Sequence, residues 1–298
     1  MNKRSFNLKG GGFQTCIHRQ KSRQQTVFLR EMHPPFHTPQ YLKIRPMSYF
    51  THPGSLLLLC IYLIIGALQA QSAREIIQKA DAKVRGTSAY AEMSIQVVRP
   101  KWTKTMHLKT WTKGKDKSVS LVTAPAKEKG TVFLMRGKEI WNYIPSIERT
   151  IKLPPSMMMQ NWMGTDMTND DLIKQSSIVT DYEQEIVGSE MVEGRNCWKI
   201  ALTPKPEASV VWGKILIWID RKDYMQLKIL YYDEDDFLVN KIIASDIKTF
   251  DRRVLPSKLE FIPVDKEGQK TIIRYQVWKF DVNIPEKYFS TRYMKRLK

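Results

Sequence analysis

The sequence predicts a mainly β protein: a single antiparallel, incomplete (half-open) β-barrel of about eleven strands, wrapped around an N-terminal helix and a short mid-chain helical lid. Three observations lead to this prediction. From residue 89 onward, apolar and polar residues alternate with period two, which is typical of strands with one wet face. Short polar turns separate most of these runs, so neighbouring strands are expected to pair as a meander. Some runs, such as 215–219, are apolar on both faces, which favours a curved sheet around an apolar interior.

The chain is expected to have three parts. Residues 1–46 are basic, carry a glycine triplet and lack apolar periodicity, so we expect a disordered extension or a wrongly assigned start. Residues 47–70 contain an apolar run that ends in small residues, which is typical of a secretory signal peptide, with an uncleaved signal anchor as the alternative. Residues 71–298 are predicted to form one domain, because no stretch within them resembles a linker.

Composition narrows the possible functions of residues 71–298. This part keeps one cysteine, Cys197, and one histidine, His107, which excludes an internal disulfide and most metal or nucleophilic chemistry. The formal net charge of the whole chain is +18, which is compatible with nucleic acid, an anionic membrane surface or simple solubility. Export makes nucleic acid the least favoured of the three. No cofactor and no metal are predicted.

The N-terminal helix is expected over residues 72–86. Ser72 and Glu75 have the spacing of a capping box, and Gly86 is a typical helix terminator. Apolar residues at 76, 77, 80 and 84 fall on one face, so the helix needs an apolar partner surface. Only sheet follows it in the sequence.

The strands are predicted wherever the period-two pattern continues between turn residues. The predicted ranges are 89–97, 104–112, 118–122, 131–135, 140–144, 149–153, 183–188, 196–203, 214–220, 226–232, 238–250, 257–263 and 270–280.

The segment 154–172 interrupts the strands. Its double proline must end a strand, and the cluster Thr168–Asp171 can cap a short helix. Between them lie one tryptophan and five methionines, whose side chains adapt to ligands of variable shape. We interpret this segment as a flexible apolar lid over a β-walled cavity. The alternative is an irregular connection whose methionines fill gaps in the core.

Acidic clusters and the lone cysteine do not indicate catalysis. Asp166, Asp170 and Asp171 have the residue type for acid/base chemistry, but helix capping explains them more simply. The acidic run 233–236 fits a hairpin turn better than a calcium loop, and Cys197 fits a buried, inert thiol. No nucleophile motif is present, so we predict that the protein is not an enzyme.

Two segments carry a family resemblance: 137–145, a glycine turn followed by Trp-x-Tyr-x-Pro, and the Met-Gly-Thr-Asp run 163–166 followed by Asp171. Over about residues 72–298 the chain resembles the periplasmic lipoprotein carriers of the LolA type, and more closely their larger relatives, the outer-membrane lipoprotein-sorting proteins. The matching motif residues are Trp141, Tyr143, Pro145, Gly164, Asp166 and Asp171. In the carriers an arginine near the turn before the third strand holds the lid shut, whereas the turn 113–116 here has none.

The resemblance implies a periplasmic carrier, in a Gram-negative-type envelope, that holds acyl chains of a lipid or lipoprotein and shuttles them towards the outer membrane. Its expected partners are acyl chains, an inner-membrane exporter and, transiently, a membrane surface; nucleic acid is not expected. Basic residues near the rim would face anionic head groups or the membrane surface, namely Arg136, Lys138, Arg149 and Lys152. The alternative functions are an exporter adaptor without lipid and, less favoured, a lipid hydrolase. The expected cavity and lid residues are Met157, Met158, Met159, Trp162, Met163, Met167, Leu172, Met93, Ile95, Trp141, Tyr143 and Trp218.

Overall fold

The computed structural model describes residues 71–174 and 177–297. The predictions made for residues 1–46 and 47–70 lie outside this part. The described helices are α2 (Ala73–Arg85), α3 (Asn169–Lys174) and α4 (Thr291–Met294), with the 3-10 turns η1 (Pro145–Ile147), η2 (Pro155–Met157), η3 (Trp162–Gly164), η4 (Ser177–Val179) and η5 (Glu286–Phe289). Within the described ranges, no helix has both the length and the apolar composition needed to cross a bilayer.

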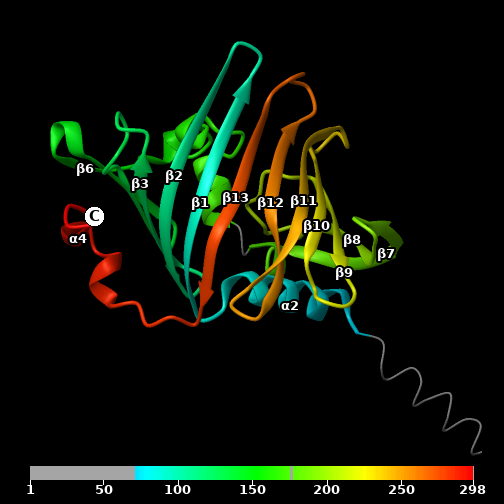
Figure 1. The fold of residues 1–298 in the computed structure, drawn as a ribbon. Coiled ribbons are helices and arrows are strands. Elements are labelled where there is room, and N and C mark those ends of the chain that lie inside the picture. The colour runs from blue at the N-terminus through cyan, green and yellow to red at the C-terminus, as the bar shows by residue number, and fades with distance from the viewer. Residues whose placement is uncertain (1–70, 175–176, 298) are drawn as a thin grey trace, which may run out of the picture. The chain divides into compact units, whose positions relative to one another are not determined.

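Thirteen strands form one antiparallel sheet in the order β6-β5-β4-β3-β2-β1-β13-β12-β11-β10-β9-β8-β7 (Figure 1). The count of about eleven is therefore too low, although the predicted ranges themselves include the short strands β4 to β6. Every predicted strand range overlaps one observed strand. The strands are β1 (Ser88–Arg99), β2 (Trp102–Lys113), β3 (Lys117–Ala124), β4 (Val132–Arg136), β5 (Glu139–Ile144), β6 (Arg149–Lys152), β7 (Tyr182–Val192), β8 (Arg195–Pro204), β9 (Lys214–Asp220), β10 (Gln226–Tyr232), β11 (Leu238–Phe250), β12 (Arg253–Pro263) and β13 (Lys270–Phe280).

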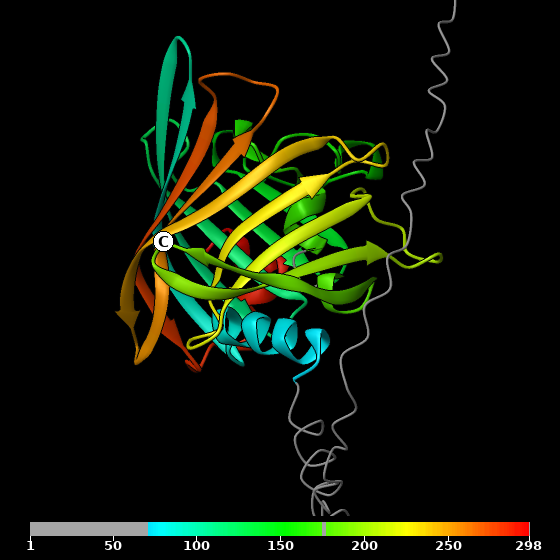
Figure 2. The same cartoon turned by 90° about the vertical axis from the view of Figure 1, so that its right-hand side faces the viewer.

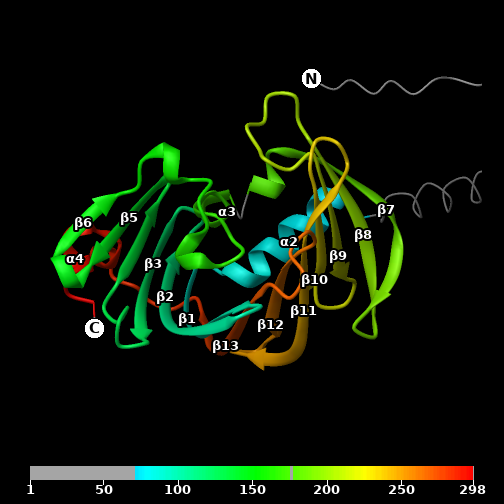
Figure 3. The same cartoon turned by 90° about the horizontal axis from the view of Figure 1, so that it is seen from above.

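The sheet curves into an arc that remains open between its edges β6 and β7, and α2 and α3 lie on its inner side (Figure 3). Register shifts in the pairs β1–β13, β2–β3, β7–β8 and β9–β10 mark bulges. A bulge bends its strand and increases the local twist, which allows a long sheet to curl. The predicted half-open β-barrel is confirmed.

Helix α2 fills one half of the inner side, beneath strands β7 to β9 (Figure 2). Ile76 and Ile77 are fully buried against Ile200, Leu202 and Ile217 of the sheet. The predicted capping box is present: the Glu75 backbone N–H donates to Ser72 Oγ at 3.2 Å, and the Ser72 N–H donates to Glu75 Oε2 at 3.3 Å. Gly86 ends the helix at φ 62°, where a Cβ would lie 2.8 Å from Asp281 Oδ1. The sequence therefore correctly predicts the N-terminal cap, the C-terminal glycine and the buried face of α2.

The C-terminal segment packs on the outer side of the sheet. Ile284, Phe289, Met294 and Leu297 cover the outward residues of β3 and β4. This segment therefore buries the outer side of β3 and β4, whereas the inward residues Ser118 and Ser120 of β3 are only half-buried. In the doubly apolar run 215–219, Ile215, Ile217 and Ile219 instead pack against α2 on the inner side, and Trp218 packs with Cys197 and Leu227 on the outer side.

Candidate functional site

A cavity of about 440 Å³ lies inside the arc of the sheet. Its size falls within the range of roughly 300–1,000 Å³ that is usual for small-molecule sites. It extends from the segment 162–172 to the β2–β3 turn near Gly114. Inward residues of β1 and β2 form much of its wall, among them Ala91, Met93, Ile95 and Leu108. The wall is therefore mainly aliphatic on this side.

Aromatic side chains also line the cavity, and strand pairing sets Tyr275 beside Met93 and Trp278 beside Ala91. Tyr182, Tyr231, Tyr275 and Trp278 all face the cavity, and Tyr275 stacks on Trp278 with ring centroids 4.1 Å apart. Burial raises the pKa of Tyr275 to about 12 and raises the pKa values of Tyr182 and Tyr231 further. Desolvation shifts a phenol in this direction because it disfavours the anion. These hydroxyls stay neutral at physiological pH in surroundings of low polarity.

The lid segment, which we define as residues 154–172, closes this cavity on one side. Trp162 and Met167 are buried in a cluster with Ile95, Leu108 and Ile273 of the sheet. The segment is also bonded internally: the Trp162 N–H donates to the Met167 carbonyl at 2.8 Å. The apolar lid therefore packs as a small hydrogen-bonded unit on the inner face of the sheet.

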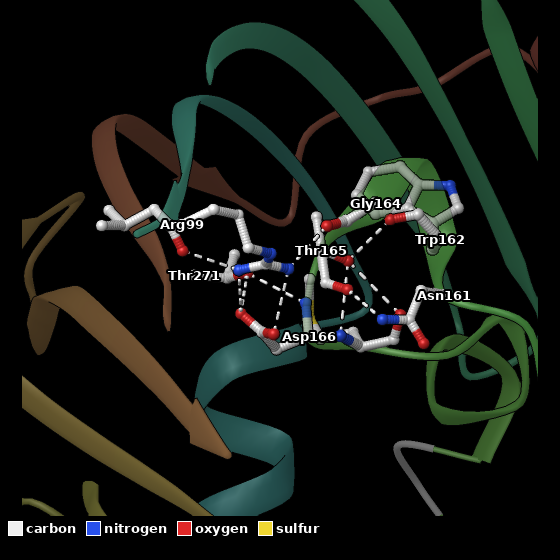
Figure 4. A network of polar contacts seen from close by, with 9 residues as sticks. Arg99, Asn161, Trp162, Gly164, Thr165, Asp166 and Thr271 are labelled. Carbon is white, nitrogen blue, oxygen red and sulfur yellow. Dashed lines mark hydrogen bonds and ion pairs between the residues drawn. The ribbon is translucent and has the colours of Figure 1, made fainter. Parts of the chain in front are cut away.

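One buried ion pair ties the lid segment to the sheet (Figure 4). Arg99, at the end of β1, donates from Nη1 to Asp166 Oδ2 at 3.1 Å, and its Nη2 lies 3.0 Å from Asp166 Oδ1 in an ion-pair contact. The same guanidinium donates to the Gly164 carbonyl at 2.7 Å, and Thr271 Oγ1 of β13 donates to Asp166 Oδ2 at 2.6 Å. The side chains of Arg99 and Asp166 are only 12% and 5% exposed. A two-pronged arginine–carboxylate contact is strong and geometrically specific, so this group is a latch, defined here as Arg99, Gly164, Asp166 and Thr271.

The two lid aspartates have different roles. Asp171 Oδ2 accepts from the Thr168 backbone N–H and hydroxyl, both at 2.8 Å, while the Asp171 N–H donates to Thr168 Oγ1 at 3.1 Å. Asp171 thus helps to start α3, as its position in the sequence predicts. The same interpretation is wrong for Asp166, whose carboxylate is the acceptor of the latch. Gly164, at φ +78°, permits the turn that presents its carbonyl to Arg99.

The structure brings part of the predicted site together. Met93, Ile95, Trp162, Met167 and Leu172 line the cavity. Met163 packs against the same cluster as Trp162. Met157 and Met159 are exposed, and Met158 is half-buried. The methionine triplet therefore lies on the solvent side of the lid segment.

Three predicted cavity residues lie on the other side of the sheet. Trp141 and Tyr143 pack with the C-terminal segment, and Trp218 packs with Cys197 and Met225 in an outer cluster. Their strand neighbours, Ile140 and Ile217 among them, face the cavity instead. The reason is the period of two: a one-residue difference in phase reverses the face, and both faces of these strands are covered. Pro145 begins the turn η1 after β5.

The sequence reasoning missed the latch arginine and the aromatic wall. Arg99 meets Asp166 across 67 residues of sequence, and no local pattern signals such a pair. Tyr231, Tyr275 and Trp278 lie in predicted strands. The sequence does not show which face of each strand points inward, so these aromatic residues can be distinguished from outward ones only in the three-dimensional fold.

The remaining candidates for chemistry have structural explanations. Residues Asp233–Asp236 occupy the β10–β11 turn, where Asp233 Oδ1 accepts from the backbone N–H groups of Asp235 and Phe237. Within the described residues, no group of three His, Cys, Asp or Glu side chains is placed to hold a metal. Burial raises the pKa of the Cys197 thiol to about 11, so the thiol stays protonated.

The arrangement of curved sheet, internal helix and lid defines the LolA-type fold. Three crystal structures share it. A DUF1329 family protein from Desulfovibrio piger has a TM-score of 0.68 and 22% sequence identity, and the match covers 74% of this chain and 97% of that one. A putative outer membrane lipoprotein-sorting protein domain from Vibrio parahaemolyticus has a TM-score of 0.66, 20% identity and coverages of 75% and 98%, and a LolA superfamily protein from Nitrosomonas europaea has a TM-score of 0.62, 22% identity and coverages of 75% and 100%. The resemblance suggested by the sequence is thus confirmed at the level of the fold. A family model with the description "Uncharacterized protein" matches residues 114–296, and the chain belongs to that family. No curated protein matches the chain.

Proposed function

We propose that this protein is a periplasmic carrier that shields the acyl chains of a lipid or lipoprotein while they cross towards the outer membrane. The observation that carries the proposal is an apolar cavity closed by a segment that one buried ion pair holds in place. The likeness in fold to lipoprotein-sorting proteins supports the same conclusion. The carrier is proposed to act without covalent chemistry, since Asp166 and Asp171 are engaged in the latch and in a helix cap.

The energetics suit a reversible carrier. Each methylene that leaves water contributes about 0.8 kcal/mol, so an acyl chain needs many methylenes in the cavity to leave a bilayer. The aliphatic wall of β1 and β2 and the aromatic wall beside Trp278 supply the required apolar surface. Opening of the latch provides a route for entry and release, because it frees the lid segment without disrupting the sheet.

Exposed apolar residues on the hairpin tips support contact with a membrane. Trp102 at the β1–β2 tip is 52% exposed and Phe237 at the β10–β11 tip is 68% exposed; Val264, after β12, is exposed as well. These tips project from the same end of the sheet (Figure 1). The latch joins the lid segment to two of these hairpins, through Arg99 next to the β1–β2 tip and Thr271 next to the β12–β13 tip. Aromatic side chains favour the membrane interface, so we propose that this end meets the donor membrane.

Replacing Trp102 and Phe237 together by serine tests this membrane contact. We expect the rate of acyl-chain transfer between vesicles to fall by about tenfold, because each residue contributes only its buried apolar area at the interface. The fold should be unchanged, since both side chains are largely exposed. A fluorescent phospholipid moving from donor to acceptor vesicles provides the measurement.

The matched control is Met191→Ser, which removes an apolar side chain that is 62% exposed on strand β7. Transfer at the unchanged rate is expected for this variant. Equal losses in the control and the tip variant would count against a specific membrane-facing end. No transfer by the unaltered protein under any lipid composition would count against the carrier itself.

One observation favours the second candidate function, an adaptor for an exporter. Strand β7 is the last strand of the sheet and is largely exposed, with Ile186, Val187 and Met191 on its surface. A long edge strand is a template for pairing with a strand of another protein. Tight binding of an exporter's periplasmic domain by a protein that takes up no lipid would favour this function over the carrier.

A further inference from the structure

A second hollow lies on the outer surface and is lined by residues of the edge strand β6 and of the segment around helix α4. Figure 1 shows these two elements at the same edge of the sheet. Trp141 forms part of it, on the side of the sheet that the C-terminal segment covers. The basic residues around it are Arg149 and Lys152 of β6, together with Arg292 and Lys295 near the C-terminus. We call it the outer groove. It is separate from the acyl cavity, because none of these residues lines both.

The fold positions this groove firmly. Strand pairing places Lys152 opposite Trp141 and Thr150 opposite Tyr143, so these side chains share one face of the hairpin. On the other bank, Met294 and Leu297 are buried against the sheet and anchor α4. Arg292 and Lys295, on either side of Met294, are exposed and carry the positive charges.

The charges of the groove are unbalanced. Four basic side chains line it against one carboxylate, that of Glu148, which leaves a net charge of 4 − 1 = +3. Arg149, Arg292 and Lys295 form no ion pair with another described residue, and Lys152 contacts Glu139 only at an exposed position. Exposed ion pairs are weak, so this lysine remains available to an anion. Clustered cations without counter-charges attract anionic ligands.

The floor of the groove adds two features that a solvated basic surface does not require. The Lys152 ammonium lies 5.7 Å from the centre of the Trp141 ring, which gives the site an aromatic platform. The Thr150 hydroxyl is buried and has no hydrogen-bond partner among the described residues. A buried polar atom without a partner is uncommon, and rotation of its side chain would offer the hydroxyl to a ligand oxygen.

We propose that the outer groove is a second binding site, distinct from the cavity, for the phosphate group of an anionic phospholipid. Arginine and lysine together match phosphate because a guanidinium donates two parallel hydrogen bonds and an ammonium adds a compact charge. The tryptophan platform and the hydroxyl accommodate the neutral part of a head group. The site holds a head group at the outer surface of the protein, whereas the cavity holds tails.

The test is sedimentation of the full-length purified protein with vesicles of phosphatidylcholine, with and without phosphatidylglycerol. We expect binding only to the vesicles that contain phosphatidylglycerol, and competition by inorganic phosphate at constant ionic strength. Arg292→Glu combined with Lys295→Glu should weaken this binding by at least about tenfold, since each basic residue near an anionic surface contributes substantially. Arg292→Lys combined with Lys295→Arg should retain it.

The control is Lys222→Glu combined with Lys248→Glu, which changes the net charge equally at exposed positions outside the groove. Equal weakening by both double reversals would show that net charge alone drives binding and would overturn the site. Binding of inorganic phosphate without vesicle binding would keep the phosphate site and overturn the phospholipid as its source. Acyl-chain uptake is measured in parallel and should be unaffected, so failure of this site is distinguishable from failure of the carrier.

Discussion

Arg99→Ala is expected to release the lid segment. The substitution leaves the Asp166 carboxylate, which is 5% exposed, with Thr271 as its remaining side-chain partner. Removing one partner of a buried ion pair costs about 3–5 kcal/mol, because the other charge stays buried without compensation. We expect this cost to appear as local opening, since the latch joins the lid segment to the sheet rather than strand to strand.

Hydrogen exchange measures this opening directly. The amides of residues 161–168 should exchange much faster in Arg99→Ala, while those of β1 and β13 remain protected. Bound acyl chains should dissociate faster in the same variant. Arg99→Lys is the matched control and should be intermediate, because an ammonium keeps the charge but cannot make the two-pronged contact.

A double variant tests whether Arg99 and Asp166 stabilise the protein through the same interaction. The double variant Arg99→Ala with Asp166→Ala should lose less stability than the sum of the two single variants, because they share one interaction. Unchanged exchange of the lid amides in the single variant, with unchanged release of acyl chains, would show that Arg99 does not hold the lid.

Ala91→Phe is expected to block the cavity. Ala91 is buried on the inner face of β1 and lines the cavity, so a phenyl ring at this position occupies space that an acyl chain needs. We expect acyl-chain affinity to fall by about tenfold or more, at a stability cost of about 1–3 kcal/mol for the added bulk. Displacement of a fluorescent fatty-acid probe measures affinity, and thermal unfolding measures stability.

Gln96→Phe is the control for this variant, because Gln96 lies on the same strand but alternates with the inward residues. It adds the same ring on the outer face and should leave affinity unchanged. A folded Ala91→Phe protein that binds the probe as tightly as the control would place the acyl chain outside the cavity.

Much of the fold follows from local sequence signals. The period of two locates the strands, and the capping box of Ser72 and Glu75 with Gly86 locates α2. Prolines mark the start of the lid segment after β6. These predictions succeed because each depends on residues that are neighbours in the chain.

The site is less predictable because it depends on which face of a strand is inner. Alternation shows that Trp141 and Tyr143 share a face, but the C-terminal segment that covers this face lies far away in sequence. The same limit applies to Trp218, whose indole N–H donates to Glu190 at 2.8 Å on the outer side. The latch is equally hard to predict, because Arg99 at the end of β1 has no local signal that points to its distant partner Asp166. Distant pairing, not residue type, creates these features.

Native mass spectrometry of the protein purified from its own cell envelope shows whether the cavity holds acyl chains in the cell. We expect the unaltered protein to carry a bound mass of lipid or lipoprotein acyl chains, Ala91→Phe to lack it and Gln96→Phe to retain it. Unaltered protein that is folded and free of bound lipid, even after incubation with envelope lipids, would show that the protein is not an acyl-chain carrier.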